Sequence, residues 1–170
     1  MKKHLLSLVF LLCIVFASQA QKNEWGIGVR GGEPSGLTIK KYFGGGANAL
    51  DISFGYNGYI YNRGRKYWHG EYRRSVALLV NYLWHKPISG ANGFELYFGF
   101  GAKVSSRRYW HKDDDFEDTT MAFGVDGVIG AEYFIPNVPV SFFVELDPYF
   151  EFVPVGWFWF DGGGGIRFNF

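Results

Sequence analysis

Hydrophobic and polar residues alternate with a period of two along most of the chain after residue 24. Residues 94–103, FELYFGFGAK, place Phe, Leu, Phe, Phe and Ala on one face and Glu, Tyr, Gly, Gly and Lys on the other. Successive side chains of a strand point to opposite faces, so this pattern predicts β-strands. Strands are predicted within residues 25–30, 37–43, 50–57, 72–84, 94–103, 121–133, 140–147 and 163–170.

The segments between these strands fall into two groups. Short, turn-like connections are predicted at residues 44–48, 85–92 and 135–139, and two long charged connections at residues 58–71 and 105–119. Alternating short and long connections are typical of an up-and-down antiparallel meander, and an even number of strands lets the last pair with the first. The predicted fold is therefore all-β, an eight-stranded antiparallel up-and-down β-barrel.

The first 20 residues have the features of a secretory signal peptide. Lys2 and Lys3 precede an apolar run at residues 5–17, and Ser18-Gln19-Ala20 fits a small-x-small cleavage site. The run of about 13 residues is shorter than the roughly 20 that a spanning helix needs. We expect cleavage near Ala20, which leaves one domain, residues 21–170, and removes the single cysteine, Cys13.

The balance of charge excludes one class of partner. Without Lys2 and Lys3 the chain has 15 basic residues of the original 17, against 16 acidic ones. A nearly neutral chain lacks the basic surface of a nucleic-acid-binding protein, so no nucleic acid is expected as a partner.

Volume decides which face of the barrel points outward. An eight-stranded barrel has room inside for side chains and little more, so the bulky Trp, Phe, Ile and Leu face is expected outside, against lipid. The other face carries glycine and ionisable groups, which predicts a lumenal polar network that plugs the interior. Its members are Arg30, Asp51, Glu95, Lys103, Asp126, Glu132, Glu145, Asp147 and Arg167. Aromatic girdles at the membrane boundaries are expected from Tyr56, Tyr82, Trp84, Tyr133, Trp157 and Trp159.

A glycine motif near the N-terminus suggests a different function. Residues 26–31 spell Gly26-x-Gly28-x-x-Gly31, which matches a dinucleotide-binding fingerprint. That fingerprint requires a helix after the turn, whereas these glycines continue a strand's alternation and residues 33–36 indicate a turn before another strand. Nucleotide binding is not predicted, nor is any other cofactor or a metal.

The C-terminal sequence GIRFNF, with Ile166, Phe168 and Phe170 spaced by two, resembles the assembly signal of Gram-negative outer-membrane β-barrels. Together with the strand pattern, the segments RGGEPSGLTIKKYF, NALDISFGYN, WHKP and GVDGVIGAEYFIPNVPVSFFVELDP make the chain similar to small barrels of the OmpA and OmpX type, in particular to short ones without an assigned activity. The resemblance implies Sec-dependent export, periplasmic chaperones, insertion by the barrel-assembly machinery, and an outer-membrane location. It implies a structural or interaction role in the envelope and no catalytic residues.

Two other functions stay open at this point. A lipid-modifying barrel enzyme, an acyltransferase or deacylase, would need an activated nucleophile, and the candidates are His69 or His111 with Ser105 or Ser106. These two histidines and His85 fall on predicted connections and are expected at the surface or at an interface. A narrow pore for ions or water is the second alternative. It is incompatible with a lumenal polar network that plugs the interior.

The two long connections carry opposite charge. Solvated surface charge is one explanation for both. Alternatively, they could contact lipopolysaccharide, bridging divalent ions or a larger envelope complex, and in the first connection Arg63, Arg65, Lys66, Arg73 and Arg74 are suited to lipopolysaccharide phosphates. The second carries Asp113, Asp114, Asp115, Glu117 and Asp118. It lacks the spacing and glycine of a calcium loop, so no metal is predicted there.

Overall fold

The computed structural model describes residues 24–57, 66–67, 70–72, 75–111, 116–154 and 156–170, with only the backbone described at 66–67, 70–72, 107–111 and 116–120. The predicted signal peptide lies outside these residues. Within them there is no helix long and apolar enough to cross a membrane.

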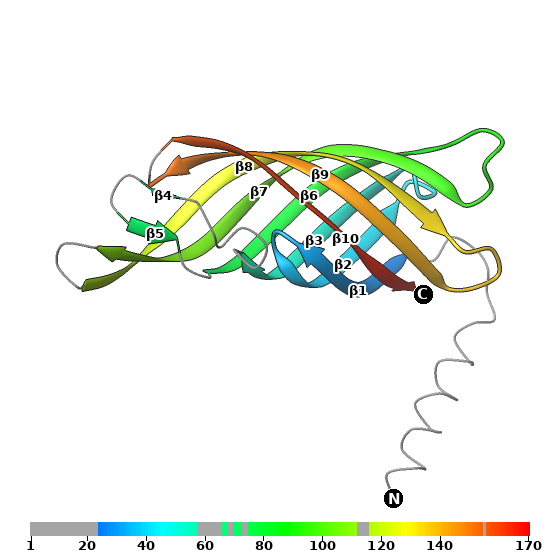
Figure 1. Cartoon of the computed structure of the whole chain (residues 1–170). Coiled ribbons are helices and arrows are strands. Elements are labelled where there is room, and N and C mark those ends of the chain that lie inside the picture. The colour runs from blue at the N-terminus through cyan, green and yellow to red at the C-terminus, as the bar shows by residue number, and fades with distance from the viewer. Residues whose placement is uncertain (1–23, 58–65, 68–69, 73–74, 112–115, 155) are drawn as a thin grey trace, which may run out of the picture.

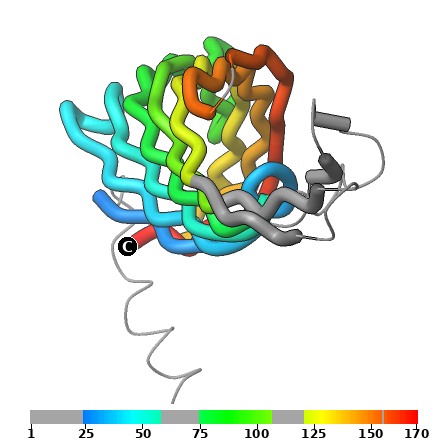
Figure 2. The backbone as a smooth tube through the Cα atoms, turned by 90° about the vertical axis from the view of Figure 1, so that its left-hand side faces the viewer, coloured from blue at the N-terminus to red at the C-terminus, as the bar shows by residue number. Residues whose placement is uncertain are grey.

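Eight long strands form a closed, all-antiparallel barrel, as the alternation predicts (Figures 1 and 2). Neighbours in sequence pair with each other, and the first and last strands close the ring. The barrel strands are β1 (Trp25–Gly32), β2 (Ser35–Phe43), β3 (Asn48–Asn57), β6 (Ser75–Pro87), β7 (Phe94–His111), β8 (Phe116–Phe134), β9 (Val140–Val153) and β10 (Trp157–Asn169). Two short strands, β4 (Lys66–Tyr67) and β5 (Gly70–Tyr72), extend the sheet beside the outer part of β7.

Several strand ends differ from the sequence prediction. The predicted connection 105–119 is mostly strand, because β7 continues to His111 and β8 begins at Phe116. At the same end β10 begins at Trp157 instead of residue 163, and at the opposite end β6 continues to Pro87. The described part of the 58–71 connection contains β4 and β5. As a result the β7–β8 hairpin projects beyond the neighbouring strands at the end with the long connections (Figure 1).

Large hydrophobic side chains lie mainly on the outside of this barrel and polar ones inside. Of the described residues, 32 large hydrophobics are exposed and only 10 hydrophobics are buried, while 22 buried residues are polar or charged. On β7, for example, Phe98 and Phe100 are exposed whereas Tyr97 and Lys103 are buried. The small apolar cluster in the interior lies near the short connections, and it consists of Tyr42, Ala49, Leu83, Tyr97 and Val128.

The aromatic residues near the strand ends mostly face outward. Trp84 stacks on Phe98 with ring centroids 5.5 Å apart and contacts Tyr82 edge-on at 5.1 Å. Tyr56 is exposed towards the other end. Trp157 and Trp159 differ from the expectation, because they lie four and two residues before the buried Asp161 and so share the inward register of β10. Trp157 is exposed, since it is the first residue of the strand.

The glycines of the Gly26-x-Gly28-x-x-Gly31 motif lie within β1, and β2 follows after a turn at residues 33–34. No helix follows, so the geometry that holds a pyrophosphate is missing from this part of the chain. A Cβ on Gly28 would lie 2.0 Å from the carbonyl oxygen of Ile166 on β10. Glycine is therefore needed here for the close approach of the two strands that close the barrel.

Gly28→Ala is expected to destabilise the barrel by about 1–3 kcal/mol, because β1 must move away from β10 to make room for the methyl group. Gly31→Ala is the matched control. Its Cβ would meet no atom closer than 3.8 Å, and we expect a change within about 0.5 kcal/mol. Denaturant unfolding in detergent micelles measures both variants, and equal losses would contradict this account of the seam.

Candidate functional site in the barrel interior

The polar residues predicted to line the lumen all lie inside the barrel. Each is at most 9% exposed: Arg30, Asp51, Glu95, Lys103, Asp126, Glu132, Glu145, Asp147 and Arg167. Period-two alternation brings them there, because each occupies the face opposite the bulky residues of its strand. The interior is thus the main candidate site, and its contacts decide what it can do.

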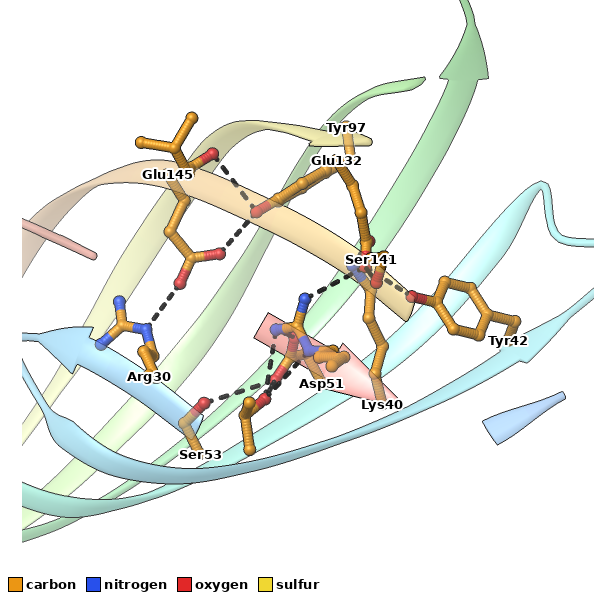
Figure 3. A network of polar contacts seen from close by, with 12 residues as sticks. Arg30, Lys40, Tyr42, Asp51, Ser53, Tyr97, Glu132, Ser141 and Glu145 are labelled. Atoms are coloured by element: carbon orange, nitrogen blue, oxygen red, sulfur yellow. Dashed lines mark hydrogen bonds and ion pairs between the residues drawn. The ribbon is translucent and has the colours of Figure 1, made fainter. Parts of the chain in front are cut away.

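Glu132 on β8 is the centre of the network nearest the short connections (Figure 3). It accepts hydrogen bonds from Lys40 Nζ at 2.8 Å, Tyr42 Oη at 2.9 Å and Ser141 Oγ at 2.7 Å. Arg167 Nη1 lies 3.4 Å from its Oε1. Lys40 reaches Glu132 from β2, which is not a neighbour of β8 in the sheet, so this ion pair crosses the interior.

Arg167 on β10 joins a second set of strands. Its Nη2 donates to Asp51 on β3 and, at 3.1 Å, to Thr38 Oγ1 on β2. Thr38 in turn donates to Asp51 at 2.9 Å. The guanidinium also lies 3.5 Å from the ring centroid of Phe143 on β9. One buried cation therefore connects β10 with β2, β3, β8 and β9.

Arg30 on β1 organises the middle of the interior. Its Nε donates to Glu145 at 2.8 Å, its Nη2 to Asp147 at 2.6 Å, and its Nη1 to the Pro34 carbonyl at 2.7 Å. Tyr97 donates to the other oxygen of Glu145 at 2.8 Å. Space for the guanidinium comes from Gly163, where a Cβ would lie 2.8 Å from Arg30 Cζ.

Lys103 and Asp126 lie closer to the long-connection end. Lys103 on β7 forms an ion pair with Asp161 on β10, and its Nζ sits 3.7 Å from the ring centroid of Tyr149. Asp126 is 4% exposed, and its Oδ1 accepts no hydrogen bond. When the side-chain amide of Asn81 is oriented so that both of its polar atoms are satisfied, its nitrogen donates to Asp126 Oδ2 at 3.1 Å.

The structure adds interior residues that the sequence prediction omitted. They include Lys40, Tyr42, Tyr97, Ser141 and Asp161, all buried. Lys40 lies on the face of β2 opposite the exposed Leu37 and Ile39, so alternation turns it inward. Asp161 precedes the predicted start of its strand. Tyr97 was assigned to the inward face but not to the polar network, although its hydroxyl is bonded to Glu145.

His85 was predicted to lie on a surface connection, and that prediction is wrong. It belongs to β6, is 4% exposed and places Nδ1 3.0 Å from Glu95 Oε2. Its ring stacks on Tyr97 with centroids 5.1 Å apart. The prediction failed because β6 runs beyond Trp84, so the histidine takes the next inward position.

The candidate nucleophile and base of a hydrolase lie only partly within the described side chains. Ser105 is buried in β7, eight positions beyond Tyr97, the residue that pairs with His85. At about 3.3 Å per residue this separation is roughly 26 Å. His111 and Ser106 belong to β7, but the side chain of His111 is not described, and His69 lies outside the described residues. No group of three potential metal ligands occurs within the described part of the chain either.

The C-terminal residues of the predicted assembly signal lie at the barrel seam. Ile166 is 40% and Phe170 50% exposed, and the Phe168 and Phe170 rings stack at 6.3 Å. Phe170 exchanges two backbone hydrogen bonds with Trp25, of 2.8 and 3.1 Å. The three residues are therefore on the outer side of the last strand, and they do not contribute to the interior.

The basic residues proposed for lipopolysaccharide contact are outside the part of the chain that is described in full. Arg63, Arg65, Arg73 and Arg74 lie outside the described residues, and Lys66 is described only as backbone in β4. Of the acidic stretch, Asp113, Asp114 and Asp115 are likewise outside, while Glu117 and Asp118 are backbone positions of β8.

Comparison with known proteins gives no family. No protein-family model matches the chain, and no curated protein matches it significantly. What the interior can do follows from its geometry alone. Its ion pairs join strands that are not neighbours, an arrangement that ties opposite walls of the barrel together.

Proposed function

We propose that this chain is an integral outer-membrane β-barrel protein with a structural or interaction role in the cell envelope. The observation that carries the proposal is the inverted distribution of side chains, with 32 large hydrophobics exposed on the outside. A soluble monomer rarely exposes a contiguous apolar patch of more than a few hundred Å². A closed barrel, in contrast, can sit in lipid because every backbone donor of its wall is paired.

The contacts inside support a plug rather than a pore. Arg30, Lys40, Lys103 and Arg167 each bond to a carboxylate on a strand that is not their neighbour. Buried charges that are paired and bonded in this way hold the walls together and occupy the lumen. The rigid barrel that results is a suitable scaffold for loops and an outer surface that contact other envelope components.

The partners follow from the same proposal. Outer-membrane lipid surrounds the apolar belt, and the barrel-assembly machinery reads Ile166, Phe168 and Phe170 during insertion. The basic residues Arg63, Arg65, Lys66, Arg73 and Arg74 would bind lipopolysaccharide phosphates. Of this segment, β4 and β5 extend the sheet beside β7. Export by the Sec pathway and cleavage near Ala20 precede these steps.

A pair of single-cysteine variants tests the location in lipid. Val144→Cys lies in the exposed belt on β9, and Val138→Cys lies in the short β8–β9 connection. Both carry Cys13→Ser, which removes the only native cysteine. In vesicles with brominated acyl chains, a fluorophore at residue 144 is expected to be strongly quenched and one at residue 138 weakly. Equal weak quenching, with a folded protein that stays in solution without detergent, would refute the proposal.

A further inference from the structure

The outer wall of the barrel carries a group of contacting aromatic rings on β2, β6 and β7, near the short connections. Trp84 lies against Phe98 with ring centroids 5.5 Å apart and against Phe100 with centroids 5.7 Å apart. Tyr82 contacts Trp84 at 5.1 Å and Phe43 at 5.7 Å. We call these five residues the aromatic platform. Because each ring packs on another, they form one continuous surface on the outside of the barrel.

Lys86 lies at the edge of this platform. It takes the next outward position of β6 after Trp84, towards the short connection, and its side chain is exposed. Its Nζ lies 5.7 Å from the ring centroid of Phe98, within the range of a cation–π contact. Among the described residues, no carboxylate forms an ion pair with Lys86. The ammonium is therefore held beside the platform, and the protein does not neutralise its charge.

A second lysine on the outer wall at this end differs in that respect. Lys41 on β2 donates to Glu24 at 2.5 Å and lies 4.5 Å from the ring centroid of Trp25. Its charge is already compensated by a carboxylate. Of these two lysines, only Lys86 is left with a charge that a ligand could neutralise.

The outward face of β6 changes its chemistry in the same order as a phospholipid does. From the short connection towards the middle of the wall it carries Lys86, then Trp84 and Tyr82, then the aliphatic residues Val80, Leu78 and Val76. Lysine binds at the level of the phosphates, tryptophan and tyrosine prefer the interface below them, and aliphatic side chains match the acyl chains. The strand and a lipid lying along it are therefore complementary at each level.

The uncompensated charge of Lys86 favours an anionic lipid. The phosphate of a zwitterionic lipid is already paired with the lipid's own ammonium group, whereas that of an anionic lipid is not. Short connections face the periplasm in barrels of this kind, so the lipid would come from the periplasmic leaflet.

We propose that Lys86 and the aromatic platform form a binding site for one anionic phospholipid. The Lys86 ammonium binds the phosphate, and an acyl chain lies over the rings of Trp84 and Phe98. The site rests on the proposed function, since it requires a bilayer around the barrel. It gives the barrel a preferred lipid neighbour on the side of β6 and β7.

A fluorophore beside the platform measures the preference. It is attached to Leu50→Cys, in the Cys13→Ser background, because Leu50 on β3 is exposed and pairs with Tyr82. Vesicles contain phosphatidylcholine and phosphatidylglycerol, and one or the other lipid carries brominated acyl chains. From the two quenching curves, phosphatidylglycerol is expected to bind next to residue 50 about fivefold more strongly than phosphatidylcholine, which corresponds to about 1 kcal/mol for one lysine. The preference is expected to decrease as salt is added.

Two lysine variants and a second fluorophore position are the controls. Lys86→Met keeps an unbranched side chain but removes the charge, so we expect the preference to disappear. Lys41→Met removes a lysine that is already paired with Glu24, so we expect the preference to remain. A fluorophore at Val144→Cys on β9, which is not a neighbour of β6, is expected to be quenched equally by both lipids.

The outcomes separate this site from the proposed function. Strong quenching at residue 50 without a preference for phosphatidylglycerol overturns the site and leaves the outer-membrane proposal standing. A preference that persists in Lys86→Met also overturns the site. Weak quenching by both lipids at residues 50 and 144 contradicts the outer-membrane proposal and the site together.

Discussion

Arg167→Met is expected to lower the free energy of unfolding by about 3–5 kcal/mol, the usual loss when one member of a buried ionic network is removed. The guanidinium bonds to Asp51, Thr38 and Glu132, and the substitution leaves the Asp51 carboxylate buried without its cation. Since folded domains are stable by only about 5–15 kcal/mol, this is a large fraction of the total. Denaturant unfolding in micelles at fixed pH measures the change.

Two further variants show whether the loss comes from the buried charge. Lys41→Met breaks a pair of the same type, Lys41 with Glu24 at 2.5 Å, but the side chains are 31% and 74% exposed and the expected loss is below about 1 kcal/mol. Adding Asp51→Asn to Arg167→Met removes the stranded carboxylate, so part of the stability is expected to return. The role given to the network is wrong if Arg167→Met costs no more than Lys41→Met.

Val144→Arg is expected to destabilise the barrel in lipid by about 2–4 kcal/mol, the cost of placing arginine near the bilayer midplane on the outer face of a barrel. Val144 is 61% exposed in the middle of β9. If water surrounded this position, a surface substitution would change stability by only about 0.5 kcal/mol. Reversible unfolding from vesicles therefore separates the two environments.

Val138→Arg is the control for Val144→Arg. The same two residue types are exchanged at a side chain that is 47% exposed, but in the connection between β8 and β9. We expect a change within about 0.5 kcal/mol there. Equal small effects at residues 144 and 138 would argue for water on both and against the outer-membrane proposal.

Most of the barrel could be predicted from the sequence because alternation of large apolar and polar residues follows directly from the strand's geometry. The signal fails beyond residue 104. There the sequence SSRRYW, residues 105–110, continues β7 without an apolar face. This part of the hairpin extends beyond the exposed apolar belt of the barrel. Backbone pairing needs no particular side chain, so the ladder between β7 and β8 continues where the hydrophobic pattern ends.

The inward position of the charged residues could also be predicted, but their pairing could not. Arg30 and Asp147 are 117 positions apart, and Arg167 and Asp51 are 116 apart. Their contacts depend on the diameter of the ring and on how far each strand is staggered, and a single sequence contains no signal for either.

The seam between β1 and β10 has a consequence for the order of events in folding. Trp25 and Phe170 meet there, so the ring cannot close before the last residues of the chain have been synthesised and delivered. Contacts between such distant parts of a chain form slowly. During that wait two strand edges are open to pairing with other molecules, and the rate of closure sets how long the chain must be shielded from aggregation.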